Sequence, residues 1–228
     1  MLHAAPVIPE TSPEHAPEQA PEEPRVARRR DRQHDDEANA LVDAARYYLN
    51  HDTRGFRDDC SGFIEAVYAR AGTPVHGSTA ALWEQARARG ATHRDRLPRP
   101  GDLAFFDNTY DRNGNGRRDD PLTHVAIVLE VDDDGTILLA HGGTSRGRTT
   151  LHMNLRDPNV QTSDRGDVMN DYLRRRDLDA PASTPRLAGQ LWRGFATWDG
   201  RDATTSDATP SKRTPLPAVG GGTTQEAT

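Results

Sequence analysis

The chain holds a single cysteine, Cys60, within the stretch RDDCSGFIEAVYARAG at residues 57–72. Apolar residues recur after it at helical spacing until a glycine and a proline end the run, so the sequence predicts a helix that begins near Cys60. Asp58 or Asp59 is placed to cap this helix by accepting hydrogen bonds from its first amides. A thiol at a helix N-terminus is expected to have a lowered pKa, which favours the nucleophilic thiolate. The alternative is a small, buried and unreactive core residue.

Two of the nine histidines, His124 and His141, stand at the ends of predicted strands. His124 opens HVAIVLEV, His141 ends TILLAH, and the DDDG between them is typical of a hairpin turn. If Val131 pairs with Thr136, the two histidines are diagonal neighbours on one face of the sheet, ~7–8 Å apart. One imidazole can then orient the other as the base for a cysteine nucleophile. A different loop length can turn the two side chains to opposite faces.

An insertion, DNTYDRNGNGRRDDPL at residues 107–122, separates the first predicted strand from His124. Its spacing matches most of a calcium-binding loop, in which alternate oxygen ligands face the ion and a glycine makes the sharp turn. The expected ligands are Asp111, Asn113, Asn115 and Asp119, with a backbone carbonyl from Arg117. The usual bidentate glutamate is missing, because Leu122 stands at its position, so affinity is expected to be weak, ~10⁻⁴–10⁻³ M. The alternative is an Asn-Gly turn without metal.

The stretch GTSRG, residues 143–147, matches the G-x-S-x-G pattern of a serine nucleophile. Such a nucleophile needs a helix directly after the serine. The residues that follow alternate like a strand, so we interpret this stretch as a loop.

The elements that position these residues change in type along the chain. Helical periodicity predicts helices at residues 38–49, after Cys60 and at 79–89, with another near Val168 to Arg175. Short apolar runs predict strands, of which the last two are RTTLHMNL and GQLWRGFATW. Helices followed by antiparallel strands indicate an α+β fold, with N-terminal helices packed on a sheet of about five strands.

The two ends differ in composition from the middle. Residues 1–34 open with a Pro-Glu step that occurs four times, which disfavours a helix, and residues 200–228 are rich in Thr, Gly and Pro. We therefore expect a disordered leader at 1–34, one domain at 35–199 and a disordered tail at 200–228.

Composition excludes several classes of function. The formal net charge is −6 and the basic residues are interleaved with acidic ones, which argues against nucleic-acid binding. No run approaches the ~18 apolar residues of a membrane-spanning helix, and the first residues lack the pattern of a secretory signal.

The blocks DCSGFIEAVYARAG, RPGDLAFF and THVAIVLEVDDDGTILLAHGG resemble the NlpC-type family of papain-like cell-wall cysteine peptidases over residues 38–143. The resemblance implies a papain-like fold in which Cys60 is the nucleophile, His124 the general base and His141 the orienting residue. It implies hydrolysis of peptide-stem bonds of peptidoglycan, often γ-D-glutamyl-diaminopimelate, without a catalytic cofactor. It also implies a periplasmic or secreted location, and we expect a monomer.

The sequence departs from the family just before the cysteine. The family often has a Y-x-W-G-G segment there, whereas this chain has YLNHDTRGFRDD. Two alternatives to a wall peptidase stay open: a catalytically silent, calcium-dependent wall-binding module, and an amidase or acyltransferase acting on another substrate.

Overall fold

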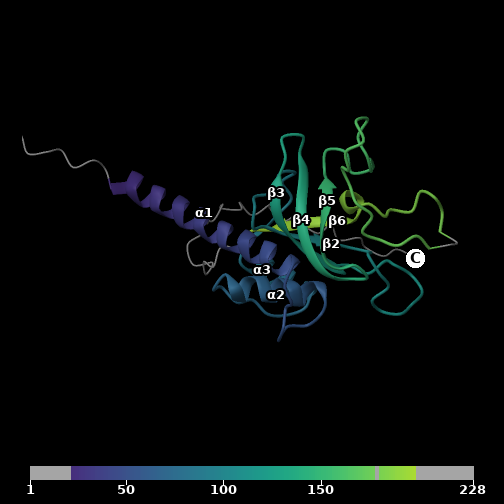
Figure 1. The fold of residues 1–228 in the computed structure, drawn as a ribbon, viewed down its shortest axis with the longest axis horizontal. Coiled ribbons are helices and arrows are strands. Elements are labelled where there is room, and N and C mark those ends of the chain that lie inside the picture. Colours follow the sequence, from purple (N-terminus) through teal and green to yellow (C-terminus); the bar gives the residue numbers. More distant parts are fainter. Residues whose placement is uncertain (1–21, 178–179, 199–228) are drawn as a thin grey trace, which may run out of the picture.

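The computed structural model describes residues 22–177 and 180–198, which form one antiparallel sheet with helices packed on it (Figure 1). The helices are α1 (Glu22–Leu49), α2 (Cys60–Arg70), α3 (Thr79–Ala88) and the short α4 (Ala188–Leu191). The strands are β1 (Thr92–His93), β2 (Leu103–Phe106), β3 (His124–Val131), β4 (Thr136–Thr144), β5 (Gly147–Asn154) and β6 (Trp192–Ala196). Their order in the sheet is β1-β6-β2-β3-β4-β5, and every pair is antiparallel. The predicted α+β class is confirmed.

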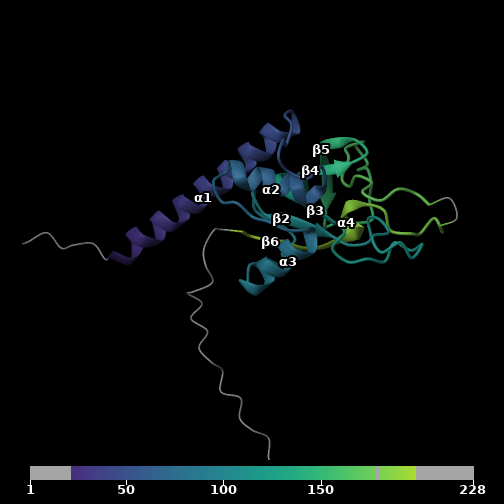
Figure 2. The same cartoon turned by 90° about the horizontal axis from the view of Figure 1, so that it is seen from below.

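Each face of the sheet has its own apolar core. Leu41 and Ala45 of α1 and Ile64 of α2 pack with one face of β2 and β3. The opposite face of the sheet packs with α4 and the segment before it. Burial on both sides explains why β2 and most of β3 are apolar without alternation. Figure 2 shows α1 and α2 together on one side, with α3 near β2 and β6.

Helix α1 begins at Glu22, so the predicted leader boundary is wrong for residues 22–34. Pro24 lies in the first helical turn, where backbone amides have no hydrogen-bond acceptor within the helix. Proline, which lacks an amide hydrogen, is therefore tolerated there. No proline follows until Pro74, and the Arg, Gln, Glu and Ala residues after Pro24 favour a helix. The N-terminal part of α1 extends away from the sheet (Figure 1). The rest of the predicted leader, residues 1–21, and the predicted tail, 200–228, lie outside the described residues.

The predicted helix near Val168–Arg175 is wrong. Val168 forms a bridge with Thr162, and Tyr172 forms one with Leu187. Between them, the fully buried Asn170 accepts hydrogen bonds from the Asn154 and Gly189 amides, and its own amide group donates to the carbonyls of residues 157 and 160. These tertiary hydrogen bonds fix an irregular backbone in place of a helix.

The sheet has six strands where about five were predicted. Strand β1 has only two residues, too few for a periodic pattern. The predicted strand GQLWRGFATW begins with α4 and becomes extended only at Trp192. Within the described residues, no helix is long and apolar enough to cross a membrane.

Candidate active site

Cys60 is the first residue of α2, as the sequence predicted, and Asp59 is the N-cap. The Asp59 carboxylate accepts hydrogen bonds from the Gly62 amide at 2.6 Å and the Ser61 hydroxyl at 2.8 Å. Burial raises the pKa of Asp59, but these two hydrogen bonds and the charge of Arg57 outweigh it and hold the pKa below its usual value. The cap is therefore charged at neutral pH and fixes the start of the helix.

Arg57 ties the loop before the cysteine to its surroundings. Its guanidinium donates to Asp59 at 3.2 Å, to the Ser61 hydroxyl at 2.9 Å and to the Gly77 carbonyl at 2.9 Å. The Arg57 carbonyl lies against Gly62 so closely that a β-carbon there would collide with it. The glycine of the DCSG block therefore allows the loop to pack directly on the first turn of α2.

The Cys60 sulfur lies between α3 and β3. It is 3.5 Å from the hydroxyl oxygen of Thr79, and the backbone of Val125, adjacent to His124, favours the thiolate form of Cys60. Burial raises the pKa of the thiol; the hydrogen bonds to Thr79 and Val125 oppose this effect, and the Asp59 charge adds to it. The lowered pKa expected from the helix N-terminus is therefore wrong for the free protein.

His124 and His141 are hydrogen-bonded to each other. His124 Nε2 lies 2.8 Å from His141 Nδ1, the rings are nearly perpendicular, and both side chains are buried. Burial lowers the pKa of His124 to about 4. Burial, together with the neighbouring His124, lowers the pKa of His141 to about 3. Both imidazoles are therefore neutral at pH 7, and one donates to the other.

The predicted strand register is correct at the histidines but wrong at the turn. Val131 pairs with Ile137 and not with Thr136. A bulge at Leu129 absorbs the extra residue, and beyond it Ile127 pairs with Ala140 as predicted. The two histidines therefore share a face.

Gly143 brings the end of β4 against the start of α2. Its φ is +70°, and a β-carbon there would collide with the Cys60 nitrogen and with the Asp59 backbone at 2.6 Å. The glycine therefore leaves open the space beside the Cys60 amide. In GTSRG, Gly147 opens β5 after a turn, and no helix follows the serine.

Tyr110 lies near the candidate site but was not predicted from the sequence. It directly precedes the predicted calcium-binding loop, residues 111–122, which we call the calcium-like loop, and it is 49% exposed. The preceding residue, Thr109, donates hydrogen bonds from its amide and its hydroxyl to the Thr123 hydroxyl, each at 2.9 Å. Burial raises the pKa of Tyr110, and the charge of a Cys60 thiolate raises it further, which places the phenol near the sulfur. Thr79 was also missed; its only signal is its place directly after the Ser78 cap.

In the calcium-like loop, side-chain oxygens accept hydrogen bonds from backbone amides of the same loop. Asp111 accepts from the Gly114 and Gly116 amides, each at 2.8 Å. Asn113 accepts from the Asn115 amide, and Asn115 from the Arg117 amide. Asp119 is exposed.

The next residue, the buried Asp120, accepts from Asn113 and from the Arg112 amide. No group of three or more His, Cys, Asp or Glu among the described residues could hold a metal ion. The side-chain oxygens and the turn glycine suit weak calcium binding, which stays a prediction.

Known protein families include one whose model covers the three residues of this site. The family model of the CHAP domain matches residues 50–143, a span that includes Cys60, His124 and His141. A search of curated proteins found no match. CHAP domains are found in NlpC/P60-like and amidase cysteine/histidine peptidases, and they suggest a hydrolase of the amidase or peptidase type, often acting on peptidoglycan. The chain is thus similar to CHAP domains over residues 50–143, which confirms the resemblance to NlpC-type cell-wall cysteine peptidases for that part of the chain.

Proposed function

We propose that the protein is a cysteine endopeptidase that hydrolyses amide bonds in the peptide stems of bacterial peptidoglycan, of the γ-D-glutamyl-diaminopimelate type. The observation that carries the proposal is the buried His124–His141 pair, joined at 2.8 Å, next to Val125, whose backbone favours the thiolate form of Cys60. A periplasmic or secreted location follows from such a substrate.

The tautomer of the histidine pair decides which nitrogen acts as the base. If His124 Nε2–H donates to His141 Nδ1, the other ring nitrogen of His124, Nδ1, keeps its lone pair for the thiol proton. His141 then stabilises the imidazolium that forms on His124 and fixes the ring orientation. This is the base-and-orienter arrangement of a catalytic triad.

The reaction begins from neutral partners, because burial raises the thiol pKa and lowers the imidazole pKa. The Cys60 sulfur attacks the amide carbonyl as its proton passes to His124. The Cys60 amide at the start of α2 is positioned to donate to the resulting oxyanion, and Gly143 leaves room for it. His124 then protonates the leaving amine, and a water molecule hydrolyses the thioester with His124 as base.

Alkylation of Cys60 separates this enzyme from a silent wall-binding module. Because the chain has one cysteine, mass spectrometry after iodoacetamide treatment reports on Cys60 alone. We expect labelling at neutral pH that becomes several-fold slower in His124→Ala, since the imidazole assists thiolate formation. A labelling rate that is the same in both proteins contradicts a base role for His124. Digestion of purified peptidoglycan tests the substrate.

A further inference from the structure

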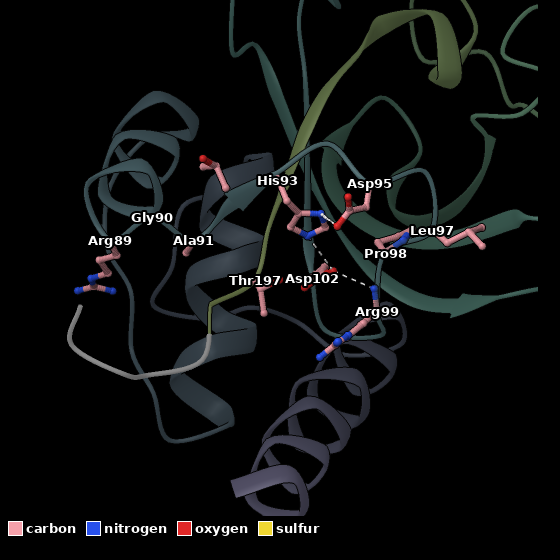
Figure 3. Close-up of a pocket in the computed structure, with 11 residues that line it drawn as sticks. Arg89, Gly90, Ala91, His93, Asp95, Leu97, Pro98, Arg99, Asp102 and Thr197 are labelled. Carbon is pink, nitrogen blue, oxygen red and sulfur yellow. Dashed lines mark hydrogen bonds and ion pairs between the residues drawn. The ribbon is translucent and has the colours of Figure 1, made fainter. Parts of the chain in front are cut away.

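Two cavities outside the Cys60 site meet on the edge strand β1. The first, about 420 Å³, is lined by residues that include Trp83, His93, Arg94, Asp107, Trp192 and Arg193, and we name it the tryptophan cavity. The second, about 410 Å³, is lined by residues that include His93, Asp95, Arg99 and Asp102, and we name it the histidine cavity (Figure 3). Thr92 and His93 line both, so the two cavities adjoin at β1, and we name them together the edge groove. Each has the size of a small-ligand pocket, ~300–1,000 Å³.

The tryptophan cavity adjoins the catalytic residues. Trp83 lies one helical turn after Thr79 on α3, and Thr79 contacts the Cys60 sulfur. On the sheet, Asp107 directly follows Phe106, which pairs with His124. A polymer that enters the catalytic site from this side therefore passes the tryptophan cavity first.

The histidine cavity extends the groove toward the other end of β2. In Figure 3, His93 points between Asp95 and the buried Asp102, and its ring nitrogens are 3.4 Å and 3.3 Å from the two carboxylates. Asp102 also accepts a hydrogen bond from the Arg99 amide at 2.8 Å. These residues place an imidazole and two carboxylates next to one another along the wall.

The chemistry of the tryptophan cavity combines flat apolar rings with planar polar groups. Arg193 donates two hydrogen bonds to Asp107, at 2.9 and 3.1 Å, and its guanidinium lies 5.5 Å from the centre of the Trp83 ring. Arg94 is exposed and lies 5.5 Å from the centre of the Trp192 ring. Sugar rings match this lining, because their C–H faces pack on indoles while their hydroxyl and acetamido groups exchange hydrogen bonds with guanidinium and carboxylate groups.

The charge of the groove favours a neutral chain. Four arginines line the two cavities, at positions 89, 94, 99 and 193, and they face three aspartates, at 95, 102 and 107. A site for a carboxylate-rich stem peptide needs a larger excess of positive charge. The near balance suits a ligand that carries hydroxyl and amide groups.

We propose that the edge groove binds an N-acetylated glycan strand. The assignment of that strand to peptidoglycan rests on the proposed function, because the peptide stems are attached to the glycan. The tryptophan cavity then holds the sugar nearest the stem that is presented to Cys60, and the histidine cavity holds the adjoining sugars.

Calorimetric titration of full-length Cys60→Ala protein with the hexamer of N-acetylglucosamine tests the proposal without requiring catalysis. We expect saturable binding with a dissociation constant of about 1 mM or tighter. Arg94→Ala should weaken it about tenfold, the effect of losing one charged hydrogen bond. The matched control, Arg96→Ala, changes an exposed arginine two residues away that does not line either cavity, and it should leave the affinity unchanged.

A second pair of variants keeps the test informative if Arg94 contributes little. Trp192→Phe should weaken binding several-fold while preserving the packing against Phe195, whereas Trp198→Phe, outside both cavities, should not. The proposal is overturned by absence of saturable heat, by equal effects of the variants within both pairs, or by Arg94-dependent binding of a γ-D-glutamyl peptide in place of the sugar. Sugar binding without hydrolysis of peptidoglycan refutes the catalytic proposal alone, and hydrolysis without sugar binding refutes this one alone.

Discussion

At the scale of single residues, the proposed reactivity of Cys60 depends on an imidazole that is itself held by a second imidazole. The sequence located all three side chains, because each stands at the end of a strongly patterned element. It could not give the protonation behaviour, because burial of the thiol and of both rings arises only from packing between α2 and the sheet. The expected thiolate is thus replaced by a neutral thiol, which in the proposed reaction loses its proton during attack.

His141 is expected to act on the rate of the chemical step and not on substrate binding. His141→Ala removes the partner of His124 Nε2 and frees the base to rotate, so kcat should fall about 10²–10⁴-fold with little change in KM. Steady-state kinetics on a stem-peptide amide checks this. His76→Ala, which removes an exposed histidine before α3, is the matched control and should keep full activity. An equal loss in both variants, or a change in KM alone, contradicts the orienting role.

At the scale of elements, the contact between the end of β4 and the start of α2 assembles the site. Gly143→Ala places a β-carbon against the Asp59–Cys60 backbone and forces a positive φ on a residue with a side chain. Gly147→Ala, in the same hairpin, has a similar φ of +72° but open space around the new β-carbon. The control should therefore lose only about 1–2 kcal/mol of unfolding free energy.

Gly143→Ala should lose more unfolding free energy than this control and most of the activity. Urea unfolding and hydrolysis rates for the two variants measure the difference. Similar stability and similar activity in Gly143→Ala and Gly147→Ala would contradict a close contact between the end of β4 and the start of α2.

The calcium-like loop gives a second prediction at this scale. Millimolar calcium should produce heat on titration and raise the melting temperature, and Asp111→Asn should abolish both effects because it removes the first carboxylate ligand. Asp164→Asn, on an exposed loop elsewhere, is the control. If calcium gives neither heat nor a shift in melting temperature, the loop is an Asn-Gly turn held by its own amides.

The sequence predicted helices and strands correctly where the apolar periodicity is strong. It failed where hydrogen bonds between distant residues determine the backbone conformation. Strands β2 to β5 and helices α2 and α3 lie within a residue or two of their predicted positions, apart from the extension of β4 to Thr144. The predicted helix near Val168–Arg175 was wrong, because Asn170 and contacts with β5 fix the backbone there and no local pattern encodes them. Similarly, nothing in the sequence shows that Tyr110 lies near Cys60 or that Trp83 and Trp192 line one cavity.

At the scale of the whole molecule, burying two neutral histidines couples stability to pH. Their pKa values are lowered to about 4 and about 3, so in the window from about pH 6.5 down to about pH 4 the unfolded chain binds protons that the folded protein does not. Stability should therefore be complete above about pH 6.5 and fall as the pH drops. The upper limit is about 1.4 kcal/mol per pH unit for each histidine.

Melting curves between about pH 7 and about pH 5, above the range where most carboxylates titrate, isolate this effect. His141→Asn should show a shallower dependence on pH than the unmodified protein, because one buried titrating ring is gone. Parallel pH profiles for the two proteins would mean that the histidine pair does not carry the effect.

The proposed reaction is tested by digesting purified peptidoglycan with the unmodified protein and with Cys60→Ala and identifying the fragments by mass spectrometry. The proposed function predicts soluble fragments with new amino and carboxyl ends at a peptide-stem amide bond, formed by the unmodified protein and absent with Cys60→Ala. Absence of fragments, cleavage that persists in Cys60→Ala, or new reducing sugar ends in place of new amino groups would contradict it.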